Sequence, residues 1–180
     1  MKCVIQSKIL DTLIDYSVPK LKYMGHSYCH FALIYSCSGK SFKIYSYGYN
    51  QLRKGKTIHA EVDAINNLPP LHKKNKKKLL KVSILVIRLT RGEKVLVDSK
   101  CCMKCCEAIY KIPALRGYTI DNVAYSNNEG DIEEHHPISL LCQEDYHLSV
   151  YYSRTNYKPK IRQSVLNNPD RKTQLFINKI

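Results

Sequence analysis

Metal-binding residue types occur at two points of the sequence. His59 is followed by Ala60 and Glu61, and Cys102, which lies 43 positions after His59, forms a Cys-x-x-Cys pair with Cys105. Imidazole nitrogen and cysteine thiolate are ligands that zinc prefers, and three protein ligands leave the fourth tetrahedral position open. This set of residues favours a zinc site that keeps an open position over a closed structural site.

A carboxylate stands two residues after the histidine. Zinc lowers the pKa of a water in the open position toward ~7. Glu61 is the residue that would take a proton from that water and return it to a leaving group. The pattern therefore predicts a hydrolytic site with Glu61 as its catalytic residue and with His59, Cys102 and Cys105 as its metal ligands.

Both halves of this pattern are expected at the starts of helices. The sequence predicts one helix over 58–68, with Thr57 as its N-cap and two prolines after it, and another over 102–112. The free N–H groups and the positive dipole end of a helix N-terminus favour a thiolate over a thiol. A Cys-x-x-Cys pair at such a start directs both sulfurs toward one place.

The rest of the chain predicts the elements that position this site. The apolar run 82–89 is typical of a strand buried on both faces of a sheet. His135 and His136 are expected in a solvated loop. Helices and strands that alternate around one sheet predict an α/β sandwich with a mixed central sheet. The other expected elements are a helix over 7–17 and strands over 29–36, 41–49, 95–98, 120–125 and 147–152.

The ordered set of motifs resembles the zinc-dependent cytidine and deoxycytidylate deaminase superfamily, whose signature is His-x-Glu followed by Pro-Cys-x-x-Cys. The similarity covers residues 29–135. Gly-Tyr-Asn at 48–50 precedes His-Ala-Glu-Val-Asp-Ala-Ile at 59–65, as in deoxycytidylate deaminase-like members, and Val-Ala-Tyr-Ser at 123–126 is similar to the strand after the cysteine helix. Cys101 replaces the signature proline, a position that supplies a turn and no ligand.

The resemblance implies a fold, a reaction and roles for single residues. The implied fold is a cytidine deaminase-like three-layer α/β/α sandwich. The implied reaction is the attack of zinc hydroxide on the amine-bearing ring carbon of a cytosine nucleotide, with Glu61 as proton shuttle and ammonia as leaving group. Besides the three zinc ligands, the implied roles are a bond from Asn50 to the sugar or base, a bond from the backbone N–H of Ala60 to the base carbonyl, and a pocket lining from Tyr125 and Ser126.

The net charge of the chain is concentrated in two segments. The sequence has 29 Lys and Arg against 15 Asp and Glu, a net charge of +14. Residues 71–81 hold six lysines and no acid, residues 146–180 hold seven basic residues and one acid, and together they supply +12. Such segments fit nucleic acid or a phosphorylated substrate, but an ordinary solvated loop explains them as well. We expect a catalytic domain over 1–152, with 71–81 as an insertion, and a basic tail over 153–180.

Three functions remain open at this point. The first is deamination of a free cytosine nucleotide of the deoxycytidylate type. The second is deamination of cytosine or adenine within DNA or RNA, with contacts from the basic loop 71–81 and the tail 153–180. The third is a non-catalytic structural or nucleic-acid-binding protein that keeps the deaminase fold. Because related enzymes are often oligomers, the resemblance is also compatible with a homo-oligomer.

Composition excludes several other classes of protein. Hydrophobic residues make up 44% of the chain, which argues against wholesale disorder. The apolar runs are far shorter than the roughly 20 residues needed to span a bilayer. No secretory signal is visible, so the close cysteine cluster indicates metal binding in a reducing compartment, cytoplasmic or nuclear. Cys101 and Cys106, which flank the ligand cysteines, are expected to be packing residues.

Overall fold

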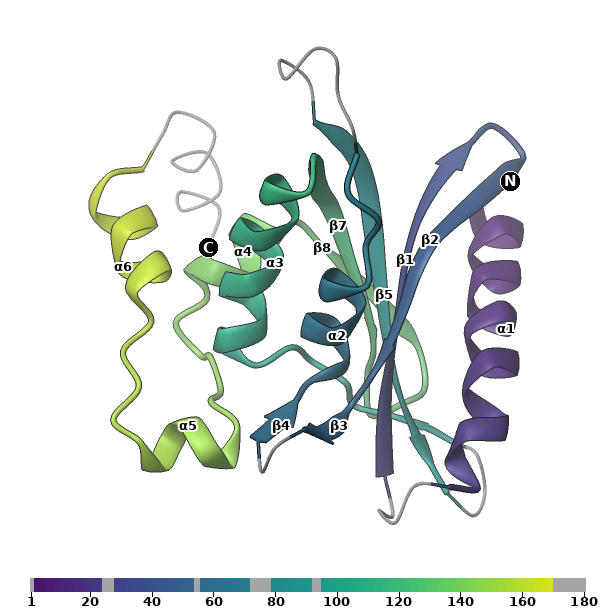
Figure 1. Ribbon diagram of the computed structural model, residues 1–180, viewed down its shortest axis with the longest axis horizontal. Helices are drawn as coiled ribbons and strands as arrows, with labels where there is room; N and C mark the ends of the chain where they lie inside the picture. The colour runs from purple at the N-terminus through teal and green to yellow at the C-terminus, as the bar shows by residue number, and fades with distance from the viewer. Residues whose placement is uncertain (1, 24–27, 54–55, 72–78, 92–94, 170–180) are drawn as a thin grey trace.

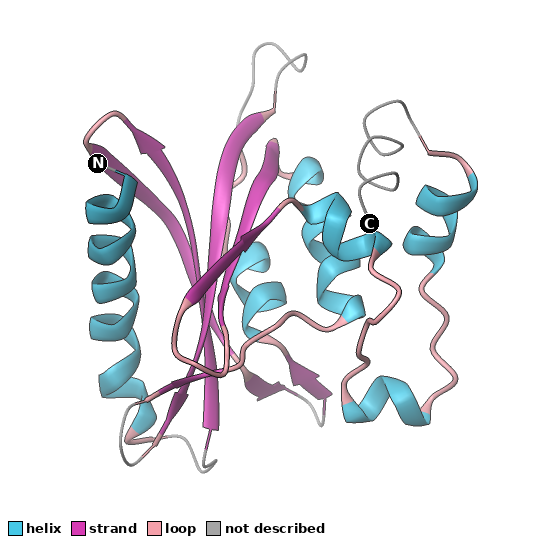
Figure 2. Ribbon diagram, turned by 180° about the vertical axis from the view of Figure 1, so that it is seen from behind, coloured by secondary structure: helices cyan, strands magenta, loops and turns pink. Residues whose placement is uncertain are grey.

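A computed structural model shows three layers, with one sheet between helices (Figure 1). Helix α1 (Lys2–Leu21) covers one face, and α2 (Ala60–Asn66) and α3 (Met103–Leu115) cover the other (Figures 1 and 2). The predicted mixed α/β fold with a central mixed sheet is confirmed, whereas the assignment to one fold family rests on the resemblance. The residues that the structure describes are 2–23, 28–53, 56–71, 79–91 and 95–169.

The central sheet has six strands in the order β2-β1-β5-β7-β8, with β6 paired to β5. β5 and β7 run parallel, and the other neighbours are antiparallel. A parallel pair needs a crossover, and α3 provides it between β5 and β7. The bounds of these strands are β1 Tyr28–Ser38, β2 Ser41–Tyr49, β5 Leu80–Thr90, β6 Leu96–Val97, β7 Tyr118–Ser126 and β8 Ile132–His135.

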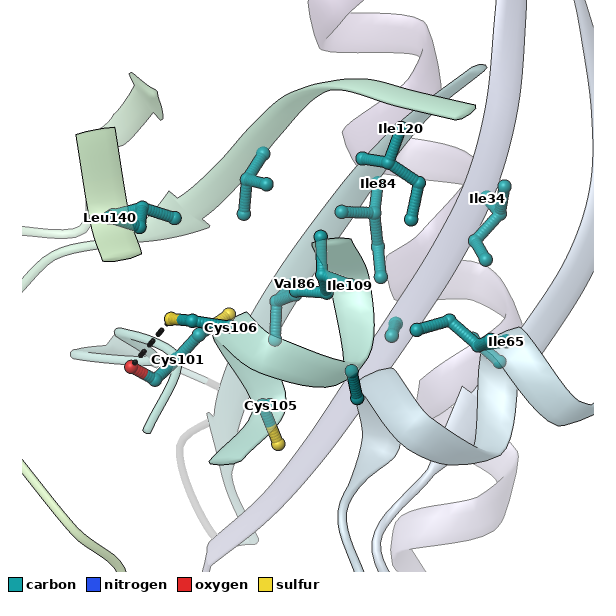
Figure 3. Close-up of a cluster of buried hydrophobic side chains, with 14 of the residues drawn as sticks. Ile34, Ile65, Ile84, Val86, Cys101, Cys105, Cys106, Ile109, Ile120 and Leu140 are labelled. Atoms are coloured by element: carbon teal, nitrogen blue, oxygen red, sulfur yellow. Dashed lines mark hydrogen bonds between the residues drawn. The ribbon is translucent and has the colours of Figure 1, made fainter. Parts of the chain in front are cut away.

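β1 and β5 are buried on both faces, as the apolar run 82–89 predicts. Alternate side chains of a strand point to opposite faces, so these strands contribute to two separate apolar clusters. Burial of each large side chain stabilises the fold by roughly 1.5–3 kcal/mol relative to exposure. The cluster under α1 includes Ile9, Leu13, Phe31, Leu33, Leu85 and Ile87. The cluster under α2 and α3 includes Ile34, Ile65, Ile84, Val86, Ile109 and Ile120 (Figure 3).

Helix α2 packs against β2 at a glycine. A Cβ atom on Gly48 would lie 2.2 Å from the backbone N of Ala64 and 2.3 Å from the carbonyl O of Ala60. Two strand residues earlier, Ser46 donates a hydrogen bond to the carbonyl of Ala64 at 2.8 Å. The absence of a side chain at Gly48 therefore sets how closely α2 approaches the sheet, and with it the position of His59 at the helix start.

The segment before α2 forms a small sheet of its own. Residues Gln51–Arg53 (β3) and Lys56–Ile58 (β4) pair as a small antiparallel sheet, in which Thr57 is opposite Leu52. Because Thr57 is held in a strand, the helix begins later than predicted. Its N-cap is His59 and not Thr57.

The C-terminal third contains helices where the sequence predicted other structure. α4 (Pro137–Cys142), α5 (Val150–Arg154) and α6 (Lys160–Asn167) follow β8, and α5 and α6 lie on the outer side of α3, away from the sheet (Figure 1). The predicted strand over 147–152 is wrong, because β8 already occupies the sheet edge beside β7.

The expected solvated loop at His135 and His136 is also wrong. His135 pairs with Val123 in the sheet. His136 caps α4, where its Nδ1 accepts a hydrogen bond from the N–H of Ile138 at 3.2 Å. Each histidine is therefore part of an element of the fold.

None of the described helices is long and apolar enough to cross a bilayer. Most of the basic segment 71–81 lies outside the described residues, because 72–78 are among those that are not described, and so do the last eleven residues of the tail. The predictions made for these segments, and the boundary between 1–152 and 153–180, stay predictions.

Candidate metal centre

The starts of α2 and α3 bring the predicted ligands together. His59 is the N-cap of α2, Cys102 is the N-cap of α3, and Cys105 lies in the first turn of α3. The Nδ1 atom of His59 is 3.3 Å from the Sγ atom of Cys105 and 3.6 Å from that of Cys102. All three ligand atoms lie within 4.8 Å of one another. The expected convergence of these residues is confirmed.

The spacing of the three atoms fits a single metal ion. Ligand bonds of ~2.0–2.3 Å in a tetrahedral arrangement put neighbouring ligand atoms roughly 3.5 Å apart. No fourth His, Cys, Asp or Glu joins this group among the residues that the structure describes. The cluster could therefore hold a metal ion through three protein ligands, with one coordination position left to a small molecule.

The protonation states of the three side chains indicate that a bound cation would stabilise the cluster. Hydrogen bonds from Cys105 and His59 lower the pKa of Cys102 to about 4, so this residue is a thiolate. The neighbouring Cys102 and burial raise the pKa of Cys105 well above its usual value. The hydrogen bond to Cys102 raises the pKa of His59. Two adjacent thiolates are thus disfavoured without a positive ion between them, and a divalent metal supplies that charge.

Glu61 lies in the first turn of α2 and is 4% exposed. Burial, followed by the charge of Cys102, raises the pKa of its carboxyl group, while His59 acts in the opposite direction. The thiol of Cys101 donates a hydrogen bond to this carboxylate. A buried acid is therefore held within electrostatic reach of two ligands.

The flanking cysteines are buried, as expected of packing residues. Cys106 Sγ donates to the carbonyl of Cys101 at 3.7 Å, and the sulfur of Cys105 points away from both (Figure 3). Cys101 and Cys106 therefore face the core behind the site, and Cys101 has the additional contact with Glu61.

A cavity of about 440 Å³ borders the cluster at His59 and Cys105. Pockets of roughly 300–1,000 Å³ are typical of sites for small organic ligands. The described part of the cavity wall is mostly apolar, with a few hydroxyl groups and one lysine. Its other lining residues are Thr57, Ile58, Val62, Lys104, Ala108, Ile112, Ser149, Tyr151 and Tyr152.

Asn50 and Ala60 do not line this cavity. The Oδ1 atom of Asn50 accepts a hydrogen bond from the N–H of His30 at 2.7 Å, and the N–H of Asn50 donates to the carbonyl of His30 at 3.1 Å. Asn50 thereby ties the end of β2 to β1, beside the start of α2. Ala60 is the first residue of α2 and is fully buried. Their roles toward a substrate stay predictions.

Tyr125 and Ser126 lie apart from the cavity as well. The hydroxyl of Tyr125 hydrogen-bonds His135 Nε2 at 2.9 Å. Ser126 is fully buried, and its Oγ donates to the carbonyl of Val97 at 2.6 Å. These side chains connect β7 to its neighbours, and their predicted place in a substrate pocket stays untested.

Asp63 and His30 also belong to this region, and the sequence reasoning did not single them out. Asp63 is 1% exposed and accepts hydrogen bonds from the N–H of Tyr49 at 3.2 Å and from Gln51 Nε2 at 2.7 Å, which fixes α2 against the end of β2. Burial, with further effects from the charges of Arg88 and His59, lowers the pKa of His30 to about 4. His30 is therefore a neutral imidazole behind the metal ligands.

The comparisons with known proteins do not assign the chain to a family. No family model matches it, and no curated protein is significantly similar to it in sequence.

Proposed function

We propose that this protein is a zinc-dependent hydrolytic deaminase that acts on a cytosine nucleotide. One observation carries the proposal: the buried Glu61 stands beside a three-ligand cluster, and two of these ligands, His59 and Cys105, line a cavity. A purely structural metal site is closed by four protein ligands and has no use for a buried carboxylate. The resemblance of 48–50, 59–65 and 102–105 to deoxycytidylate deaminase-like members supports the same reading.

Zinc is the metal that this donor set favours. Two thiolates and one imidazole in a tetrahedral arrangement suit zinc better than calcium or magnesium, which bind oxygen ligands. Bound by His59, Cys102 and Cys105, a zinc ion would supply Lewis acidity and a water with a pKa near ~7.

In the proposed reaction the proton is transferred by the side chain of Glu61. Burial raises the pKa of Glu61, which brings the carboxyl group closer to the range in which it both accepts and releases a proton near neutral pH. Its carboxylate oxygen takes a proton from the attacking water and delivers it to the departing amine. Ile58, Val62 and Ile112 line the cavity with apolar surface, which keeps bulk water away from the reacting ring.

A base within a single-stranded nucleic acid is the second candidate substrate. The net charge of +14 favours it, because counterion release makes a basic protein bind polyanions. The two candidates require the same residues at the metal centre and differ in what lies beyond the cavity mouth.

The test combines zinc content with ammonia release. The panel consists of cytidine, deoxycytidine, their monophosphates, and single-stranded DNA and RNA. We expect about one zinc per chain and ammonia release that Glu61→Ala reduces by about 10²–10⁴-fold with the zinc retained.

Glu134→Ala serves as the control, because Glu134 is a partly buried acid on the α1 side of the sheet, bonded to Gln6. It should leave ammonia release unchanged. Zinc binding without turnover of any panel member contradicts the proposal and favours a non-catalytic protein.

A further inference from the structure

The chain that follows α4 returns to the start of α3. The backbone N–H of Met103, next to the ligand Cys102, donates a hydrogen bond to the carbonyl of His147 at 3.0 Å. This bond uses one of the N–H groups that a helix N-terminus leaves unpaired. Residue 147 is thereby held at the metal centre, two positions before Ser149, which is the N-cap of α5.

A second attachment holds the other end of this segment. Glu107 is 3% exposed, and its Oε1 accepts hydrogen bonds from the backbone N–H groups of Ile161 at 2.7 Å and Arg162 at 3.1 Å. Its Oε2 accepts one from the hydroxyl of Tyr157. A carboxylate at the N-terminus of α6 also interacts favourably with the helix dipole. The segment 147–162, which contains α5, is therefore fixed to α3 at both ends.

This segment forms one wall of the cavity, through Ser149, Tyr151 and Tyr152. The rings of Tyr152 and Tyr157 lie 4.9 Å apart, and the Nζ atom of Lys104 lies 5.1 Å from the ring of Tyr157. The Oγ atom of Ser149 is shielded from solvent and has no hydrogen-bond partner within the described part of the chain. The wall thus combines aromatic surface with an unpaired hydroxyl group.

The charge of the described cavity lining is positive. Among the residues that the structure describes, Lys104 is the one basic residue of the lining apart from the ligand His59, and none of the described lining residues is an Asp or Glu. Lys104 forms no ion pair with any acid that the structure describes. A neutral ligand would leave this ammonium group without a counter-charge, whereas an anionic group beside Lys104 would pair with it.

We propose that the segment 147–162 is a fixed wall of the substrate cavity, and that this wall and Lys104 together select a nucleobase that carries a phosphate group. Tyr152 provides the surface for the ring, Lys104 pairs with the phosphate, and Glu107 is a positioning residue that acts through α5. The identity of the ring as a nucleobase rests on the proposed function. The phosphate belongs either to a free nucleotide or to a nucleic acid strand.

Binding to the zinc-loaded full chain tests the role of Lys104. Isothermal titration compares cytidine monophosphate with cytidine for wild type, Lys104→Met and the control Lys111→Met, which removes the same charge from an exposed position of α3. We expect Lys104→Met to weaken nucleotide binding about tenfold and cytidine binding less than about twofold. Lys111→Met should change neither. Equal losses for both ligands, equal effects of both variants, or no binding to wild type overturns the proposal.

Two further pairs of variants test the wall. Tyr152→Leu should weaken nucleotide and nucleoside alike by about tenfold, and Tyr152→Phe should restore both. Glu107→Leu should weaken both ligands, whereas Glu107→Gln, which keeps an acceptor oxygen, should do so less. The visible spectrum of the cobalt-substituted protein should be the same in all four, because the metal ligands are untouched. Unchanged binding in Tyr152→Leu and Glu107→Leu contradicts the proposal that the segment 147–162 forms a wall of the substrate cavity.

The outcomes separate this inference from the proposed function. Selective phosphate binding without ammonia release keeps the inference and rejects the deaminase. Ammonia release that is insensitive to Lys104→Met and Tyr152→Leu keeps the deaminase and rejects the inference. A single-stranded oligonucleotide that binds more tightly than cytidine monophosphate, with a steep salt dependence, identifies a nucleic acid strand as the source of the phosphate. Equal or weaker binding identifies the free nucleotide.

Discussion

On both faces of the central sheet the side chains of β1 and β5 form an apolar core, but the covering helices meet the sheet in different ways. α1 lies along its face as one long helix, and a cavity of about 230 Å³ beneath it is lined mainly by apolar side chains. On the opposite face two shorter helices begin close together, with His59 and Cys102 as their N-caps. The comparison shows that the candidate chemistry arises from helix ends, while both faces share the stabilising core.

The largest predicted effect on stability comes from cavities made in the two cores. Leu13 of α1 and Ile65 of α2 are both fully buried in the two clusters. Leu13→Ala and Ile65→Ala should each lower the free energy of unfolding by about 2–5 kcal/mol, measured by urea denaturation. Only Ile65→Ala should also weaken zinc binding, because α2 carries His59. Equal losses of zinc affinity in both variants would mean that the metal centre depends on global stability and not on α2.

The second prediction concerns the close approach of α2 to β2. Because the backbone of α2 lies within 2.3 Å of a Cβ at Gly48, we expect Gly48→Ala to destabilise the protein by about 3 kcal/mol and to displace His59. Gly39→Ala is the control: it has a positive φ but open space around it, so it should cost about 1 kcal/mol and leave zinc binding intact. Thermal unfolding and zinc titration of both variants measure the difference. A Gly48→Ala protein with wild-type stability would contradict the packing described for α2.

The third prediction is a dependence of stability on pH that arises behind the metal ligands. The pKa of His30 falls from 6.5 to about 4 on folding, chiefly through burial. The folded state therefore disfavours the protonated form, so the stabilisation is complete above pH 6.5 and is lost as the pH falls toward 4. The loss amounts to about 3 kcal/mol.

Urea denaturation between pH 7 and pH 4 measures this effect. His30→Gln should flatten the decline in stability across that range, and the exposed His147→Gln should reproduce the wild-type curve. If stability declines as steeply in His30→Gln as in wild type, the pH dependence arises from the titration of groups other than His30.

The sequence predicted the metal centre because its residues are tied to strong local signals. Histidine and cysteine at helix starts limit where their side chains point, and the apolar run 82–89 predicts a central strand. The resemblance of the ordered motifs implies in addition that His59 lies beside Cys102 and Cys105, as the structure shows. The prediction of Thr57 as N-cap failed because tertiary pairing in β3 and β4 overrides the local preference of threonine.

The C-terminal third was harder to predict because its elements are short. α4 and α5 span six and five residues, too few for a helical periodicity to appear in the sequence. α6 is held by hydrogen bonds to Glu107, a residue more than fifty positions earlier in the chain. One signal was present: Glu107 is the only acid in the otherwise apolar and basic helix α3, and a lone acid on a buried helix needs a partner.

Metal analysis of ligand variants tests the metal centre most directly. Wild type, Cys102→Ser, Cys105→Ser and the control Cys142→Ser, a buried cysteine outside the cluster, are prepared with zinc and dialysed. The zinc content is measured together with the thiolate-to-metal absorption of the cobalt forms. We expect about one zinc per chain in wild type and Cys142→Ser and a large loss in the two ligand variants. A wild-type chain without zinc, or ligand variants that retain it fully, would contradict the metal centre.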